Sequence, residues 1–215
     1  MDEQGEAKFH QVAFDALPQG EATLLGVLHQ FTAERMQAAE RCRARAVQAL
    51  QAAATAEPDL HAFLRECWEA LDGLAREVNV CMYHAFPGAG LFPPTEMTRQ
   101  CTFYVVRKKL YESPQTSEHP VSRLLWERTR EAPDEAYGRL SFLYNLSLFF
   151  PLPIPDGKGL PGTSDLPESV RGIVKGAQIE RCDLAEGTQA IVDWLTDFTD
   201  ECYRRLAGTL VADGC

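Results

Sequence analysis

The stretch Asp59–Ala85, DLHAFLRECWEALDGLAREVNVCMYHA, decides the fold class of this chain. Its apolar residues recur every three or four positions, which is the spacing of one face of an α-helix. The positions on this face are Leu60, Phe63, Leu64, Cys67, Leu71, Leu74, Val78, Cys81 and Met82. The stretch therefore predicts a long amphipathic helix with one buried face.

A second long helix is predicted just before it, over Glu21–Ala56, because this range contains no proline and one glycine. Its apolar face is predicted at Leu24, Leu28, Phe31, Met36, Ala39, Cys42, Ala46, Ala49, Leu50 and Ala53. Only Glu57-Pro58-Asp59 interrupts the pattern between the two helices. So short a connection predicts an antiparallel helical hairpin.

The rest of the chain also reads as helices separated by proline-rich breaks. They are predicted at Thr95–Glu112, Val121–Glu131, Asp134–Phe149, Pro167–Lys175 and Asp183–Val211. Within the first of these, residues 102–111 are β-branched and aromatic, so a strand is the alternative there. Asp183, with Glu186 three positions later, has the pattern of a helix N-cap.

These elements predict an all-α fold, a bundle of about five to seven mainly antiparallel helices with long irregular loops. We expect residues 1–215 to form a single helical domain. Residues 1–20 are expected to be a tail or a short leading helix. Residues 151–167 contain five prolines and three glycines, so we expect an irregular crossover loop there.

The amino-acid composition excludes some classes of binding partner and indicates the cellular compartment. The net charge of −10 argues against nucleic acid and against anionic membranes as partners. The chain has no apolar run long enough for a transmembrane helix, and its acidic N-terminus does not resemble a signal peptide. The seven cysteines form no CxxC pair, which indicates free thiols and a cytoplasmic location.

The only local group of residues that suggests chemistry is Glu77, Cys81 and His84, with Tyr83 beside them. Spacings of four and three place the first three on one helical face, and each could bind a metal or ligand. The alternative is that Cys81 belongs to the core and His84 interacts with the helix end. Tyr104 and Tyr144 are candidate neighbours of this ligand site.

No established catalytic or cofactor motif is found. The chain has no Glu-x-x-His pair, no HExxH and no GxSxG, and residues 156–164 do not match a phosphate-binding loop. The sequence therefore predicts no metal site, names no cofactor and leaves enzymatic activity undecided.

The most apolar segment is Leu146–Ile154, which suggests an interface between subunits. Its candidate contact residues are Leu148, Phe149, Phe150 and Leu152. The alternative is that this segment closes one end of the bundle. Two functions follow: association, most simply as a homo-oligomer or with another protein, or a ligand or metal site between helices, which includes an enzyme.

Overall fold

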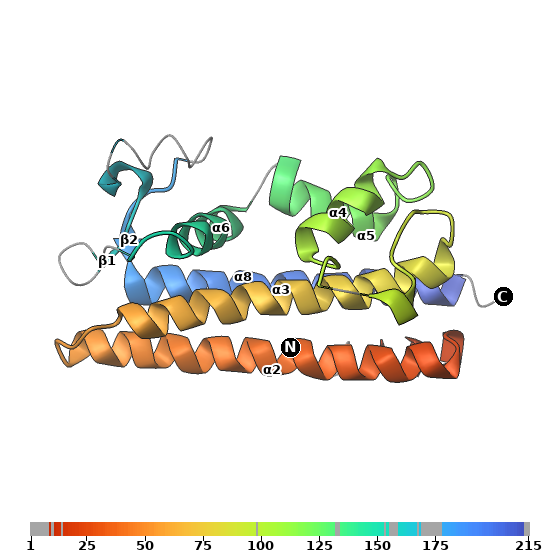
Figure 1. Cartoon of the computed structure of the whole chain (residues 1–215), viewed down its shortest axis with the longest axis horizontal. Helices are drawn as coiled ribbons and strands as arrows, with labels where there is room; N and C mark the ends of the chain where they lie inside the picture. The colour runs from red at the N-terminus through yellow and green to blue at the C-terminus, as the bar shows by residue number, and fades with distance from the viewer. Residues whose placement is uncertain are drawn as a thin grey trace. The chain divides into compact units, whose positions relative to one another are not determined.

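The fold is all-α, as predicted. The computed structural model describes residues 9, 11–13, 15–97, 99–131, 134–152, 154, 159–166, 168 and 178–212. Its elements are α2 (Gln19–Gln51), α3 (Glu57–Ala85), η1 (Pro94–Glu96), α4 (Phe103–Glu112), α5 (Pro120–Trp126), η2 (Glu127–Glu131), α6 (Glu135–Ser147), β1 (Gly159–Leu160), η4 (Thr163–Asp165), β2 (Cys182–Asp183) and α8 (Leu184–Ala212) (Figure 1). The described residues between Phe9 and Ala16 are also helical.

Contacts divide the chain into two compact units, each built from segments distant in sequence. Unit 1 comprises Met1–Glu34, Glu69–Ala132 and Leu195–Cys215, and unit 2 comprises Arg35–Trp68 and Pro133–Trp194. Each unit therefore contains one part of α2, one part of α3 and one part of α8.

In unit 1, α2 and α3 are antiparallel, which agrees with the predicted hairpin. Thr32 on α2 is bonded to Glu77 on α3, and Glu21, earlier on α2, faces His84, later on α3. The helices approach closely at Gly73, where an added Cβ would lie 2.5 Å from the Thr32 hydroxyl oxygen. The absence of a side chain at this position lets the two helices meet there.

The parts of α3 and α8 in unit 1 run in parallel. The backbone N–H of Phe103 donates to Asp72 on α3 at 2.8 Å, while its ring packs edge-on against Phe198 of α8. Five residues later on both helices, the Tyr203 hydroxyl donates to Glu77. A parallel pair needs a long connection, and the chain between α3 and α8 supplies it.

Residues 103–112 are helical, so the strand alternative for 102–111 is wrong. Buried residues at positions 103, 106, 107 and 110 have helical spacing, which explains this outcome. The helix was expected to begin at Thr95, but that residue lies in the short 3-10 helix η1, and α4 begins at Phe103. The Asp72 carboxylate accepts from the first N–H of α4 and marks its start.

In unit 2, α2 and α3 are again antiparallel. Arg35 pairs with Glu66 at 2.9 Å, and Arg45, later on α2, pairs with Asp59, earlier on α3. The unit is completed by α6, by the antiparallel pair of β1 and β2, and by the start of α8. The predicted N-cap is confirmed, since the Asp183 carboxylate accepts from the backbone N–H groups of Ala185 and Glu186.

The expectation of an entirely irregular segment over residues 151–167 is wrong in detail. Its described part contains the short strand β1 and the 3-10 helix η4. Both form because residues 179–183 supply partners, for example the Ile179 carbonyl for the N–H of Thr163. The helix expected over Pro167–Lys175 lies outside the described residues apart from Glu168, which is helical. Among described residues, no helix is long and apolar enough to cross a membrane.

Candidate functional site

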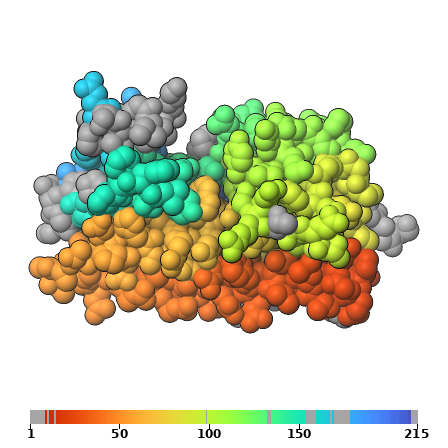
Figure 2. Space-filling model, in the orientation of Figure 1, coloured from red at the N-terminus to blue at the C-terminus, as the bar shows by residue number. Residues whose placement is uncertain are grey.

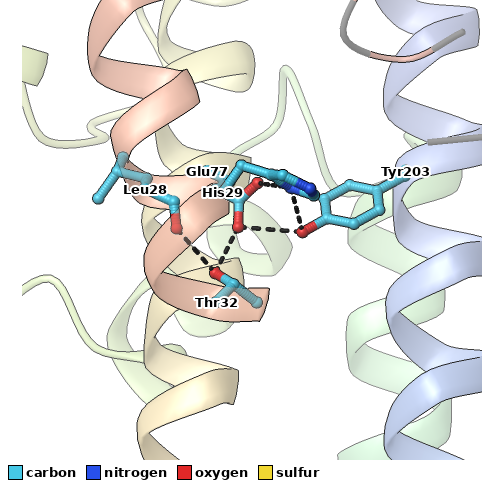
Figure 3. Close-up of polar contacts among 5 residues, drawn as sticks. All are labelled: Leu28, His29, Thr32, Glu77 and Tyr203. Carbon is cyan, nitrogen blue, oxygen red and sulfur yellow. Dashed lines mark hydrogen bonds and ion pairs between the residues drawn. The ribbon is translucent and has the colours of Figure 1, made fainter. Parts of the chain in front are cut away.

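The candidate site is a cluster of polar side chains inside unit 1, centred on Glu77. Helix α2 contributes His29 and Thr32, which lie three positions apart and so share one face. Helix α3 contributes Glu77, and α8 contributes Tyr203 (Figure 3). All four residues are buried, and the Glu77 side chain has no exposed surface.

Both oxygens of the Glu77 carboxyl group are within hydrogen-bond distance of partners. The Thr32 hydroxyl donates to Oε1 at 2.5 Å, and the Tyr203 hydroxyl donates to the same oxygen at 3.0 Å. His29 Nδ1 lies 3.1 Å from Oε2 and 3.0 Å from the Tyr203 oxygen. With Glu77 ionised, these distances favour the tautomer in which Nδ1 carries the proton and donates.

Two acceptor oxygens in the cluster compete for the same hydroxyl hydrogen. The single hydroxyl proton of Thr32 has a second acceptor, the Leu28 carbonyl oxygen at 3.1 Å. When the carboxyl group of Glu77 is protonated, its demand for hydrogen-bond donors falls. The Thr32 hydroxyl can then donate to the Leu28 carbonyl oxygen instead. The arrangement therefore accommodates both protonation states of Glu77 without moving a helix.

Burial is the main influence on the electrostatics of this site. It raises the pKa of Glu77, and the hydrogen bonds from His29, Thr32 and Tyr203 oppose that change only in part. Burial raises the pKa of the Cys202 thiol to about 12 and raises that of Cys81 as well, and the nearby charge of Glu77 adds to both. Both thiols are therefore protonated at neutral pH, which makes them poor nucleophiles and poor metal ligands.

The structure separates the four ligand candidates that the sequence suggested. Glu77 lies in the cluster, and Cys81 is fully buried one turn further along α3. Tyr83 is half-buried and His84 is exposed, where it faces Glu21 of α2 at 3.6 Å. Within the described part of the chain, no group of three His, Cys, Asp or Glu residues could hold a metal ion.

The two tyrosines suggested as neighbours lie elsewhere. Tyr104 is on α4 with an exposed side chain, and Arg107 lies over its ring. Tyr144 belongs to unit 2, where its ring stacks on Trp68.

His29, Thr32 and Tyr203 are the members that sequence reasoning missed. On α2, the predicted apolar residues Leu24, Leu28 and Phe31 are only half-buried. The buried line instead passes through Leu25, His29 and Thr32, so it contains two polar residues. A test for polar residues on the alternative helical face, at the same spacing of three and four, could have found them.

The ring of Phe9 covers the cluster on the Tyr203 side. It stacks on the Tyr203 ring with centroids 4.9 Å apart and an interplanar angle of 19°. Phe9 itself has no exposed surface. The imidazole of His29 meets the same tyrosine ring at 5.1 Å with a tilt of 59°.

Unit 1 also has an open groove of about 380 Å³ along α5, η2 and α8. It is lined by Leu124, Arg128, Asp197, Asp200, Glu201, Arg204 and Arg205. Glu201 pairs with both Arg204 and Arg205, and Arg205 also donates to the Pro120 carbonyl at 2.7 Å. We interpret the groove as a solvated surface of ion pairs, which contributes little binding energy.

The candidate interface residues in unit 2 are divided between surface and core. Leu148 and Phe149 are 56% and 72% exposed, Phe150 is half-buried and Leu152 is buried.

Comparison of the chain with protein-family models, with curated proteins and with solved structures finds no match.

Proposed function

We propose that this helical protein works by association, as a homodimer formed through the end of α6. The observation that carries the proposal is the exposure of Leu148 and Phe149, two large apolar side chains that are adjacent in the chain. Phe149 is the most exposed large hydrophobic residue of the described chain. Contiguous apolar patches on a protein surface mark interaction sites, and we take this pair as the centre of one.

The segment that presents them is firmly held in its own unit. Leu146 and Leu152, on either side of the exposed pair, are buried, and the Phe150 N–H donates to the Leu146 carbonyl at 3.0 Å. Figure 2 shows α6 (turquoise) at the visible surface of unit 2. The apolar pair is therefore presented on an ordered support, which lowers the entropy lost when it binds.

The absence of charged residues in the segment that carries the pair favours a second copy of this chain as the partner. No charged residue occurs from Leu140 to Pro155, although 24% of the chain is charged. Each copy carries a net charge of −10, so two copies repel each other over most surfaces. An uncharged segment is where two like-charged copies can meet at the least electrostatic cost.

The proposed contact between two identical copies most simply lies on a two-fold axis. Ser141 and Asn145 precede the pair at the helical spacing of four, and the Asn145 amide donates to the Ser141 carbonyl at 2.7 Å. In a two-fold contact the same surface of both copies meets, so Leu148 and Phe149 of one copy would face the same pair on the other. The polar groups would then form the rim around Leu148 and Phe149.

Native mass measured over a range of concentrations tests the proposal. We expect the unaltered chain to form a dimer at micromolar concentration and Phe149→Asp to be a monomer, because the substitution places two like charges in the contact. Val27→Asp is the control, since Val27 is 62% exposed but lies on α2 in unit 1. It should leave the dimer unchanged.

An unaltered chain that stays monomeric through this range would overturn the proposal. A dimer that Phe149→Asp leaves intact would overturn the choice of surface. Circular dichroism on each variant separates loss of association from loss of folding.

A further inference from the structure

Phe9 packs on the Glu77 cluster in unit 1, whereas α6, which forms the proposed dimer contact, lies in unit 2. The tyrosine that Phe9 stacks on is the same residue whose hydroxyl bonds Glu77 and His29. A ring in the place of Phe9 therefore has an aromatic face beneath it and a buried carboxyl group close to the edge of that face.

Phe9 belongs to a short segment that a single break separates from the long helix. The described residues between Phe9 and Ala16 are helical, and helical structure is interrupted at Leu17 and Pro18 before α2 begins. Ala13 and Leu17 are buried with Phe9, while Pro18 is exposed. Within the described residues of this segment, Phe9 is therefore the largest buried side chain.

The chemistry around Tyr203 selects the kind of molecule that could replace Phe9. The stacked geometry suits a flat aromatic ring. The donors to Glu77 come from two hydroxyl groups and one imidazole, so a full compensating positive charge is present only if His29 is protonated. A ligand that supplies a cation would offset the cost of burying the carboxylate, and its N–H groups would form charge-assisted hydrogen bonds.

We propose that the place of the Phe9 ring is a binding site for a small planar aromatic cation. The cation stacks on Tyr203 and directs its N–H donors toward the His29–Glu77–Tyr203 cluster. In the free chain Phe9 occupies this place, so binding requires that the segment carrying Phe9 moves away. Phe9 is then an internal competitor that weakens ligand binding in the unaltered chain.

Benzamidine, a planar aromatic amidinium, is a suitable probe, with benzoate as the control of equal size and opposite charge. By calorimetry we expect saturable binding of benzamidine at millimolar concentration and no binding of benzoate. Phe9→Ala should bind benzamidine about tenfold more tightly or better, because the competing ring is gone. Glu77→Gln should weaken benzamidine binding by about tenfold or more, because the charge-assisted bonds are lost.

A second measurement uses the unaltered chain and does not depend on the folding of a variant. The Leu17 N–H donates to the Ala13 carbonyl at 3.0 Å, so its hydrogen exchange reports whether this segment stays folded. Benzamidine should accelerate exchange at Leu17 while slowing exchange at the Thr32 amide, next to the cluster.

Three results would overturn the proposal. One is the absence of saturable benzamidine binding to both the unaltered chain and Phe9→Ala. Another is equal binding of benzamidine and benzoate. The third is benzamidine binding that leaves hydrogen exchange at Leu17 unchanged, since the ring would then bind without displacing the segment.

Discussion

A carboxyl group without any exposed surface, such as that of Glu77, is costly to ionise in the core of a helical protein. Three side chains on two other helices offset this cost with hydrogen bonds to both carboxyl oxygens. Replacing such a cluster by apolar residues often leaves a protein as stable or more stable. Stability alone therefore does not account for this buried carboxyl group in unit 1.

The sign of the pH dependence follows from the direction of the Glu77 pKa. Because burial raises that pKa above its ordinary value of 4.5, the folded state holds the proton more tightly than the unfolded state. The resulting stabilisation is fully present below pH 4.5 and is lost as the pH rises through the pKa of the folded state. Glu77→Gln should abolish this dependence, because glutamine does not titrate.

Urea denaturation of both proteins at a series of pH values measures this effect. The free energy of unfolding of Glu77→Gln, relative to the unaltered chain, should increase with pH by at most about 1.4 kcal/mol per unit and then level off. Asp72 also has a raised pKa, but it is present in both proteins and cancels in the difference. A difference that does not vary with pH would show that Glu77 titrates alike in the folded and unfolded states.

At this scale the sequence identified one member of the cluster and missed the others. Glu77 was predicted as a site residue because of its helical spacing from Cys81 and His84. Its hydrogen-bond partners, however, are on α2 and α8, more than 40 positions away in the chain. Apolar periodicity cannot identify His29 or Thr32, because it treats a polar residue as an exposed one. A search for polar residues on the other face of α2 could have suggested them, but their contacts with Glu77 become visible only when the helices are packed.

At the scale of elements, the helices were predictable and the α2 face was not. Helices α2, α3, α6 and α8 lie close to their predicted positions because their apolar repeats are long. In the first half of α2, however, the half-buried Leu24, Leu28 and Phe31 form a stronger apolar pattern than the buried line through Leu25 and His29. The choice between these two faces depends on the contact with α3, which the sequence of α2 does not contain.

Gly73 is the residue that allows this contact, and Gly73→Ala tests it. An added Cβ would lie 2.5 Å from the Thr32 hydroxyl oxygen and 3.1 Å from a ring carbon of Phe31. We expect a net loss of about 1–2 kcal/mol in the free energy of unfolding, because overpacking outweighs the gain in helix propensity. The same denaturation experiment on Gly26→Ala is the matched control.

Gly26 lies on α2 in the same unit and has no heavy atom within 4 Å of an added Cβ. Gly26→Ala should therefore stabilise the chain by up to about 1 kcal/mol. Combining Gly73→Ala with Thr32→Ala should cost less than the sum of the two single changes, since the atom that clashes is removed. Equal effects of Gly73→Ala and Gly26→Ala would show that the close approach does not constrain the helices.

At the scale of the whole molecule, the division into two units raises the question of whether they unfold separately. Domain boundaries usually fall in exposed linkers with few contacts. Here three of the four boundaries fall inside helices, at Glu34/Arg35 in α2, Trp68/Glu69 in α3 and Trp194/Leu195 in α8, and the fourth lies at Ala132/Pro133. Unfolding one unit alone would therefore have to end three helices in their middle, where no cap is available to satisfy the freed backbone groups.

We therefore predict that the chain unfolds as one cooperative domain, as its sequence suggested, and the three tryptophans allow a direct test. Trp126 is in unit 1, while Trp68 and Trp194 are in unit 2. Trp68→Phe/Trp194→Phe leaves a fluorescent probe in unit 1 only, and Trp126→Phe leaves probes in unit 2 only. Within each variant, tryptophan fluorescence and circular dichroism should give the same urea midpoint. Circular dichroism reports the helices of both units and fluorescence reports one unit, and both should follow the same single transition. If circular dichroism instead shows two steps, and the probes of the two units follow different steps, the units are separate domains. Helices α2, α3 and α8 must then break near residues 34, 68 and 194.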